Sequence, residues 1–332
     1  MEKKTVALIA CSNGYGHIRR LLLLSQALKQ SGATPVLFVP LLATEIIAKS
    51  EGITIPQIVD FDTHTNKENW LDGTSADWVK SAPSFSDFDI VISDNLIEIL
   101  EIRPDAWLSG SFFWHESLNR FPSQLKKKSL KLLSKYQPKM ISSKMFSSNE
   151  IECHTKLYEV GLYTQETPSM KFINKTDALV ACGLGGSVKE EAREFVKSLA
   201  MMKGTNFERI WIEPSILPNV YPDWMVPATF TRKMYQNVIA AVIRPGVGTV
   251  TSSLSTGARI FPFYERNNKE MELNALRIHS FGVGENTLLI NDAWSQAELF
   301  RINNESQIEH YKKVQNLDMD GAKQAAHIIL NS

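Results

Sequence analysis

The stretch Thr5–Leu28 reads TVALIACSNGYGHIRRLLLLSQAL and joins an apolar run, a glycine-containing turn and a leucine-rich segment. The apolar run predicts a buried strand over Thr5–Cys11, and the leucines predict a helix over Gly16–Gln30. A strand, a glycine turn and a helix in this order usually bind phosphate. A phosphate cradle needs only small residues, yet this turn places His17 at the start of the helix.

The turn does not match the dinucleotide-binding fingerprint. That fingerprint needs three glycines in the spacing G-x-G-x-x-G and an acidic residue about 20 positions later. Gly14 and Gly16 supply the first two glycines, but Arg19 replaces the third. The next predicted strand, Thr34–Val39, leads into Pro-Leu-Leu and offers no acidic residue. These departures argue against a nicotinamide-dependent dehydrogenase.

Strand and helix patterns alternate along the first half of the chain. The predicted strands are 5–11, 34–39, 53–59, 89–93 and 106–110, and the predicted helices are 16–30, 42–50 and 123–136. Continuous apolar strands between helices are typical of a parallel sheet that is covered on both faces. We assign no further strand before a domain boundary near 163–175, where Thr167-Pro168 interrupts the pattern.

The second half of the chain repeats this order. Its predicted strands are 177–182, 209–212, 226–230, 240–243 and 259–263, and its predicted helices are 188–203, 249–256, 269–281, 293–303 and a long segment near 306–330. The predicted fold class is α/β, with two facing, doubly wound, Rossmann-like parallel-sheet domains and a deep cleft between them. We place these domains at 1–165 and 166–315, and expect a C-terminal helix in 316–332 to pack back on the first domain.

The 332-residue chain is electrically balanced, with 36 Lys+Arg and 36 Asp+Glu residues. This balance gives no reason to expect nucleic acid as a partner. The three cysteines indicate reduced thiols, and their spacing does not suit zinc, so we expect no metal site. No apolar stretch reaches the roughly 20 residues that cross a membrane, and no secretory signal is recognisable, which favours a cytoplasmic protein.

The turn around His17 suits acid–base chemistry. Gly14 and Gly16 let a substrate approach the backbone, because neither carries a Cβ atom. An unprotonated imidazole at this place can take a proton from a hydroxyl group. In the alternative interpretation, His17 only caps the helix or packs on the sheet edge.

Two further glycine turns predict anion binding in the second half. Gly183–Ser187 follows a predicted strand and precedes a helix, so its backbone N–H groups suit a diphosphate. A similar turn runs from Arg244 through Gly246 and Gly248 to Thr249, where a hydroxyl and a guanidinium could also bind phosphate oxygens. Each turn by itself could equally be an ordinary strand-to-helix connection.

Three segments resemble the GT-B superfamily of glycosyltransferases. They are SNGYGHIRR (12–20), RPGVGTVTSSLSTGARIFPF (244–263) and EMELNALRIHSFGVG (270–284). The first is similar to the opening motif of the lipid II-forming N-acetylglucosaminyltransferase and UDP-glycosyltransferase branch, and of the related UDP-sugar hydrolase of pseudaminic acid synthesis. The second is similar to the superfamily's nucleotide-sugar motif. The third is similar to its sugar-reading segment.

This resemblance implies an acceptor on the first domain and a nucleotide-sugar on the second. It implies an inverting reaction that needs no metal and no cofactor, because helix dipoles and backbone amides stabilise the diphosphate leaving group. His17 matches the family's catalytic base, and Asp94 falls where some members place the acidic partner of that histidine. In the alternative interpretation, Asp94 caps the helix that follows its strand.

The candidate contacts combine the turns, the resemblance and an aromatic stretch, Ser109–Glu116. The predicted donor contacts are Gly185, Gly186, Ser187, Arg244, Gly246, Gly248, Thr249, Val250, Ser252, Glu270 and Asn274. The predicted acceptor contacts are Asn13, Gly14, Tyr15, Gly16, Arg19, His115 and Glu116. Ser252 stands where the family often has a ribose-binding glutamate, and Met271 where it has a glutamine, which leaves the nucleotide base open.

We therefore expect an enzyme that transfers a sugar, favoured as a UDP-sugar, to a hydroxyl acceptor in cell-envelope glycan or glycoconjugate synthesis. The acceptor would be a saccharide or a lipid-linked molecule. One alternative is a nucleotide-sugar hydrolase that uses water, and another is a non-catalytic binding protein. The lysine-rich amphipathic segment Ser123–Tyr136 could contact the inner face of the membrane, or simply be a solvated surface helix.

Overall fold

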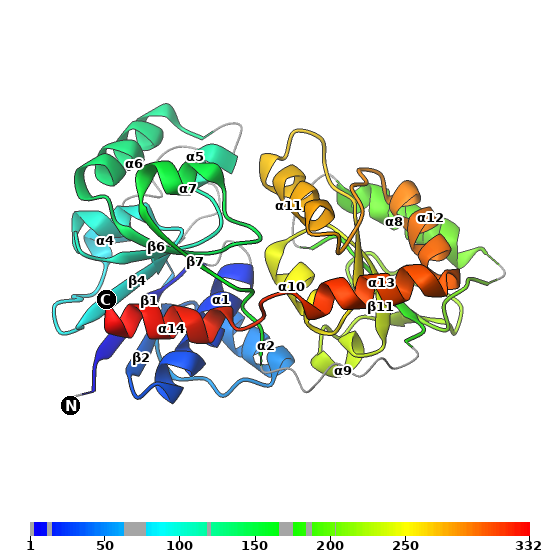
Figure 1. The fold of residues 1–332 in the computed structure, drawn as a ribbon, viewed down its shortest axis with the longest axis horizontal. Helices are drawn as coiled ribbons and strands as arrows, with labels where there is room; N and C mark the ends of the chain where they lie inside the picture. Colours follow the sequence, from blue (N-terminus) through cyan, green and yellow to red (C-terminus); the bar gives the residue numbers. More distant parts are fainter. Residues whose placement is uncertain are drawn as a thin grey trace. The chain divides into compact units, whose positions relative to one another are not determined.

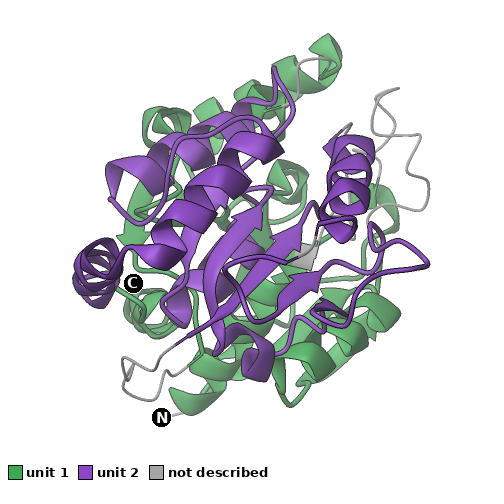
Figure 2. Cartoon of the chain, turned by 90° about the vertical axis from the view of Figure 1, so that its right-hand side faces the viewer, with its two compact units in different colours: residues 1–165, 318–332 green, residues 166–317 purple. Residues whose placement is uncertain are grey.

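The computed structural model describes residues 3–11, 15–62, 78–117, 121–165, 175–183, 188–202 and 204–332. The chain forms two compact units (Figure 2). Unit 1 contains residues 1–165 together with 318–332, and unit 2 contains residues 166–317. The C-terminal segment therefore belongs to the same unit as the N-terminus.

Unit 1 is built on a seven-stranded parallel sheet in the order β3-β2-β1-β4-β5-β6-β7 (Figure 1). Its strands are β1 (Thr5–Ile9), β2 (Thr34–Val39), β3 (Gln57–Asp60), β4 (Ile90–Asp94), β5 (Trp107–Ser109), β6 (Lys139–Ser143) and β7 (Lys156–Val160). Its described helices are α1 (Tyr15–Gln30), α2 (Leu41–Glu51), α4 (Trp78–Ser81), the 3-10 helix η2 (Ile97–Glu101), α5 (Trp114–Ser117), α6 (Ser123–Tyr136), α7 (Asn149–His154) and α14 (Gly321–Asn331).

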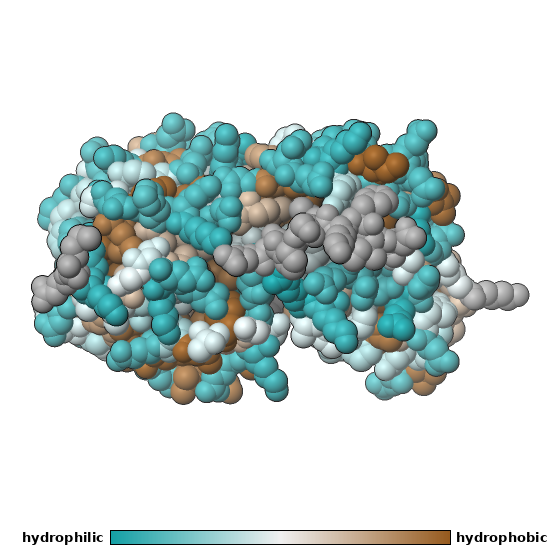
Figure 3. Space-filling model, turned by 60° about the horizontal axis from the view of Figure 1, so that its bottom comes forward, coloured by the Kyte–Doolittle hydropathy of each residue, from teal (hydrophilic) through white to brown (hydrophobic). Residues whose placement is uncertain are grey.

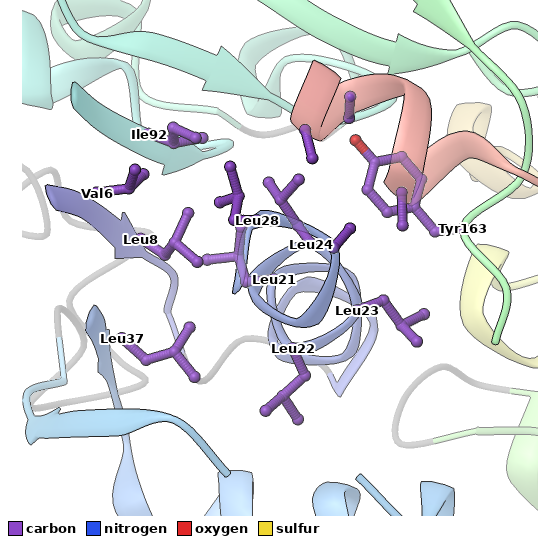
Figure 4. Close-up of a cluster of buried hydrophobic side chains, with 14 of the residues drawn as sticks. Val6, Leu8, Leu21, Leu22, Leu23, Leu24, Leu28, Leu37, Ile92 and Tyr163 are labelled. Carbon is purple, nitrogen blue, oxygen red and sulfur yellow. The ribbon is translucent and has the colours of Figure 1, made fainter. Parts of the chain in front are cut away.

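Strand β1 lies inside the sheet of unit 1, and its alternating side chains are buried on both faces. Val6 and Leu8 of β1 enter a core with α1 and α14 (Figure 4), whereas Ala7 and Ile9 enter a second core with η2 and α6. This alternation explains the uninterrupted apolar run in the sequence, since a strand between two helical layers has no solvent face.

Unit 2 is built on a five-stranded parallel sheet in the order β10-β9-β8-β11-β12. Its strands are β8 (Asp177–Ala181), β9 (Ile210–Ile212), β10 (Met225–Pro227), β11 (Val238–Ile243) and β12 (Arg259–Pro262). Its described helices are α8 (Val188–Ala200), α9 (Arg232–Tyr235), α10 (Val247–Ser255), α11 (Lys269–Ser280), α12 (Ile290–Ile302) and α13 (Asn304–Gln315). The apolar faces of α8 and α12 share one core with β8 and β11. The predicted fold class, two parallel sheets with helices on both sides, is confirmed.

The C-terminal region differs from the predicted long helix over 306–330. The structure has two helices, α13 and α14, because the segment between them bonds to the chain that follows β7. The Leu162 N–H donates to the Asp318 carbonyl at 2.8 Å, and the Gly321 N–H donates to the Leu162 carbonyl at 3.0 Å. α14 then packs along α1 (Figure 4) and contributes Ala325, Ala326 and other apolar residues to the core.

Two strands of unit 1 are not predicted from the sequence. β6 and β7 lie in a region to which we assign no strand, because their short segments KMISS and KLYEV mix apolar residues with charged and hydroxyl-bearing ones. β7 forms an edge of the sheet, so much of it stays exposed.

On the face that Figure 3 shows, hydrophilic residues predominate and hydrophobic residues form small separate patches.

Candidate functional site

The predicted base His17 lies at the carboxyl edge of the unit 1 sheet. β1 and β4 are parallel neighbours in the register Ile9↔Ser93, so the residues that follow these strands meet at one edge. His17 stands in the first turn of α1, and Asp94 is the last residue of β4. The Nδ1 atom of His17 lies 2.7 Å from the Oδ1 atom of Asp94, and both side chains are buried.

The Asp94 carboxylate accepts further hydrogen bonds from two elements. Arg20, three residues after His17 on α1, donates from Nε to Oδ2 at 2.7 Å and from Nη2 to Oδ1 at 2.9 Å. The Ser109 hydroxyl, at the end of β5, donates to Oδ2 at 2.7 Å. Burial would raise the pKa of Asp94, but the charge of Arg20 and the hydrogen bonds from His17 and Arg20 outweigh it and hold that pKa well below its usual range. Asp94 is therefore a fixed anion beside the imidazole.

Asp94 does not cap the helix that follows it. η2 begins at Ile97, and its N-cap residue is Leu96, which makes no side-chain capping hydrogen bond. Asn95 adopts a left-handed backbone conformation, with φ 57°, which turns the chain away directly after Asp94. The carboxylate is thus left for His17 and Arg20, and the helix-cap alternative does not hold.

The contact with Asp94 determines what His17 can do. With its Nδ1 proton donated to the carboxylate, the imidazole carries its lone pair on Nε2, the arrangement of a general base with an orienting acid. The indole of Trp114 lies against the imidazole, with ring centroids 5.5 Å apart. Trp114 begins α5, which follows β5 at the same sheet edge.

His115 and Glu116, two predicted acceptor contacts, follow Trp114 on α5. His115 is 7% exposed, neither of its ring nitrogens has a hydrogen-bond partner among the described residues, and its ring stacks on Phe113 at 5.5 Å. Burial lowers the pKa of His115 to about 4, so the ring is neutral at pH 7. Glu116 instead holds the local chain, because its Oε2 atom accepts bonds from the Phe113 N–H and the Ser148 hydroxyl.

A small pocket lies beside these residues in unit 1. Its lining is aromatic and apolar with a few polar groups: Trp78, Asn95, Leu96, Ile97, Glu98, Trp114, His115, Phe121, Leu125 and Ser129. Trp114 both lines this pocket and contacts the imidazole of His17, and Asn95, another lining residue, directly follows Asp94. Burial raises the pKa of Glu98, which favours its uncharged form relative to an exposed glutamate.

The remaining predicted acceptor contacts belong to the first glycine turn. Asn13 and Gly14 lie outside the described residues, and only the backbone of Tyr15 is described. A Cβ atom at Gly16 would meet no atom of the described residues within 4 Å. Arg19 points to the interior of unit 1 and forms an ion pair from Nε to Glu51 Oε1 at 2.6 Å. Its role toward an acceptor stays a prediction.

The turn after β8 is held by a residue that the sequence did not reveal. Glu213, which follows β9, accepts hydrogen bonds through Oε2 from the Cys182 N–H at 2.9 Å and the Gly183 N–H at 2.8 Å. These bonds fix the point at which the chain leaves β8, although no motif marks Glu213. The predicted donor contacts Gly185, Gly186 and Ser187 lie outside the described residues.

The turn after β11 leads directly into α10. Gly246 is the N-cap of this helix, no described side chain caps its amides, and its first turn carries no acidic residue. Val247, Gly248 and Thr249 are partly exposed, whereas Val250 is buried. The uncapped N–H groups and the positive end of the helix dipole make this end of α10 suited to an anion.

Other predicted donor contacts serve to shape this turn. Arg244 forms a two-point ion pair with Glu265, at 2.7 Å from Nη2 to Oε1 and 3.0 Å from Nε to Oε2. Asn274 is buried in α11 and donates from Nδ2 to the Pro245 carbonyl at 2.9 Å. Ser252 is buried in α10, and Glu270 lies in the first turn of α11.

The basic helix α6 matches its predicted bounds, and its apolar side packs inward. Leu125 and Leu133 are buried in unit 1, and Lys128 forms an ion pair with Glu101 at 2.7 Å. Within the described ranges, no helix is long and apolar enough to span a bilayer. In the same part of the chain, no group of His, Cys, Asp and Glu side chains has the arrangement of a metal site.

No protein-family model and no curated protein sequence matches this chain. Solved structures do match it over its whole length. The glycotransferase of kitacinnamycin has a TM-score of 0.64 at 12% identity and covers 99% of both chains. The calicheamicin glycosyltransferase CalG4 has 0.64 at 14% identity, covering 99% of this chain and 98% of its own. The spinosyn rhamnosyltransferase SpnG with thymidine diphosphate has 0.62 at 11% identity, covering 99% and 100%. The two-unit fold is thus that of GT-B glycosyltransferases, as the motifs indicate.

Proposed function

We propose that this protein is an inverting glycosyltransferase that moves a sugar from a nucleotide-sugar to a hydroxyl group of an acceptor. The observation that carries this proposal is the buried His17–Asp94 pair at the carboxyl edge of the unit 1 sheet. A pair of this kind is a general base with its orienting acid. The GT-B fold supports the choice of reaction among those that such a base can serve.

In the proposed reaction, Nε2 of His17 takes the proton of the acceptor hydroxyl. The resulting oxygen nucleophile forms a bond to the anomeric carbon of the donor sugar. The bond from that carbon to the diphosphate breaks, its electron pair stays on the diphosphate, and the sugar product has the inverted configuration. Asp94 stabilises the imidazolium that forms on His17.

We assign the donor to unit 2. The amides at the start of α10, with the Thr249 hydroxyl, would bind the diphosphate and accommodate the charge that develops as it leaves. Because Glu265 engages Arg244, the amides rather than this guanidinium would provide most of the attraction. This arrangement supports a mechanism in which no metal ion is needed.

We assign the acceptor to unit 1. His115 is the candidate contact that the geometry favours, because it lines the same pocket as Trp114 and its buried ring nitrogens have no hydrogen-bond partner among the described residues. A UDP-sugar donor and a role in cell-envelope glycan synthesis stay predictions, and so does membrane contact through 123–136. The last of these rests on the lysines of α6 alone, since Leu125 and Leu133 pack inward.

The test is a turnover assay on the full chain. UDP-, TDP- and GDP-sugars are offered with saccharide and small hydroxylated acceptors, with EDTA present, and release of the nucleoside diphosphate and the sugar product are both measured. We expect one donor to be used, and His17→Ala to abolish turnover while leaving donor affinity intact. His327→Ala, which alters an exposed histidine on α14, serves as the matched control.

Three results would contradict the proposal. Binding of no nucleotide or nucleotide-sugar would argue against the donor site on α10. Free sugar released at the same rate with and without acceptors would indicate a hydrolase. Turnover that survives in His17→Ala would refute the assignment of the base.

A further inference from the structure

We propose that Arg20 is a positioning residue for His17, acting through Asp94. This inference rests on the proposed function in taking His17 as the base, but it concerns how that base is held ready. Arg20 and His17 are three residues apart on α1, so both side chains project from one face of the helix. Both reach the same carboxylate at the end of β4.

Every hydrogen-bonding position on Asp94 is taken. Oδ1 accepts from His17 Nδ1 at 2.7 Å and from Arg20 Nη2 at 2.9 Å. Oδ2 accepts from Arg20 Nε at 2.7 Å and from the Ser109 hydroxyl at 2.7 Å. The two-point contact with the planar guanidinium fixes the plane of the carboxylate, which a single hydrogen bond would not do. The plane of the carboxylate in turn fixes the imidazole.

Arg20 also maintains the charge of Asp94. The Asp94 side chain is fully buried, and a carboxylate without a cation in such a place is driven towards its protonated form. The groups in direct contact with it are His17 and Arg20 from α1 and the hydroxyl of Ser109 from β5. The buried phenol of Tyr163 is also close enough for the charges of Arg20 and Asp94 to affect its pKa. Arg20 supplies the permanent positive charge among these groups.

The charge of Asp94 decides which nitrogen of His17 is free. An ionised Asp94 accepts the Nδ1 proton and leaves the lone pair on Nε2. A protonated Asp94 no longer requires that tautomer, and the imidazole can then carry its proton on Nε2, where it cannot act as a base. Arg20 would thus keep Asp94 ionised, and the proton of His17 on Nδ1, at a lower pH than would be possible without this guanidinium.

The kinetic test compares Arg20→Met with Arg20→Lys across the pH range. Arg20→Met removes the cation, so the pKa of Asp94 should rise. We expect kcat to fall roughly 10- to 100-fold, the usual effect of losing a residue that orients a functional group. The acid limb of the kcat profile should move to higher pH, and KM for the donor should stay unchanged. Arg20→Lys keeps the charge but not the two-point contact, so it should lower kcat less and leave the acid limb in place.

Arg103→Met is the matched control. Arg103 makes a two-point ion pair with Asp105, also in unit 1, and donates to the Phe85 and Phe88 carbonyls. Among the described residues it makes no hydrogen bond to His17 or Asp94. It should lower stability without changing the pH profile. A movement of the acid limb in this control as large as in Arg20→Met would overturn the proposal.

A second measurement separates this inference from the proposed function. ¹⁵N NMR of the imidazole, assigned by the loss of its signals in His17→Gln, reports the tautomer without any turnover. We expect the wild type and Arg103→Met to hold the proton on Nδ1, and Arg20→Met to lose this preference. Arg20→Met with a wild-type tautomer and acid limb would refute the role of Arg20. If the chain transfers no sugar, the tautomer comparison still decides it.

Discussion

A buried histidine in unit 2 makes the stability of this protein depend on pH in a way that can be calculated. His310 on α13 is 2% exposed and packs edge-on against Phe300, with ring centroids 5.7 Å apart. Burial, followed by the charge of Arg259, lowers the pKa of His310 from 6.5 to about 3. The folded chain therefore keeps this ring neutral over a pH range in which the unfolded chain protonates it.

The sign and size of the effect follow from this difference. Below pH 6.5 the unfolded chain binds a proton that the folded chain does not, so stability falls as the pH is lowered towards 3. Each pH unit in that window corresponds to about 1.4 kcal/mol, and between pH 7 and pH 5 His310 should therefore remove about 2 kcal/mol of the free energy of unfolding.

The perturbation is His310→Leu, which keeps an apolar side chain of similar reach and removes the ionisable ring. Urea unfolding of wild type and variant at pH 7, 6 and 5, followed through a transition assigned to unit 2, gives the two pH dependences. The variant should lose about 2 kcal/mol less than the wild type between pH 7 and pH 5. His279→Leu, at an exposed position on α11, should behave as the wild type does. Equal losses in wild type and His310→Leu would refute the reasoning.

Three further predictions concern the site and the packing of α14 within unit 1. Asp94→Asn should lower kcat by a factor on the order of 10⁴, because the amide no longer fixes the tautomer of His17. If Asp94 were only structural, steady-state kinetics would show a smaller loss of kcat. Thr249→Val should raise the Kd for the nucleoside diphosphate roughly tenfold, the effect of one lost charge-assisted hydrogen bond, whereas Thr249→Ser should bind normally by calorimetry. Gly321→Ala should lower the free energy of unfolding by about 1–3 kcal/mol, since the added Cβ would lie 2.1 Å from the Gly161 carbonyl oxygen. An unchanged Tm would contradict this prediction.

The sequence predicts those elements whose cause is local. β2 and α6 have the predicted bounds, because a continuous apolar run and an amphipathic period identify them without knowledge of their neighbours. The break between α13 and α14 cannot be predicted in this way. No proline or glycine stands at residues 316–320, and the helix stops there because Asp318 bonds to Leu162, which is distant in sequence.

The same distinction applies to the candidate site. The proximity of His17 and Asp94 could be inferred from family motifs, and the structure brings the two side chains together. The sequence analysis gives Arg20 no role, although Arg20 closes the motif SNGYGHIRR and lies three residues from His17 on a predicted helix. Glu213 carries no such signal, because its contact with the start of the turn after β8 depends on the pairing of β8 with β9.

The position of α14 in the chain has a consequence for biosynthesis. Unit 1 needs α14 to cover α1, but the ribosome makes all of unit 2 before it reaches α14. At 5–20 residues per second, synthesis of residues 166–317 takes roughly 8–30 s. During that interval the nascent first unit carries an uncovered strip of leucines, which is a surface for a chaperone to bind and a hazard for aggregation on the polysome.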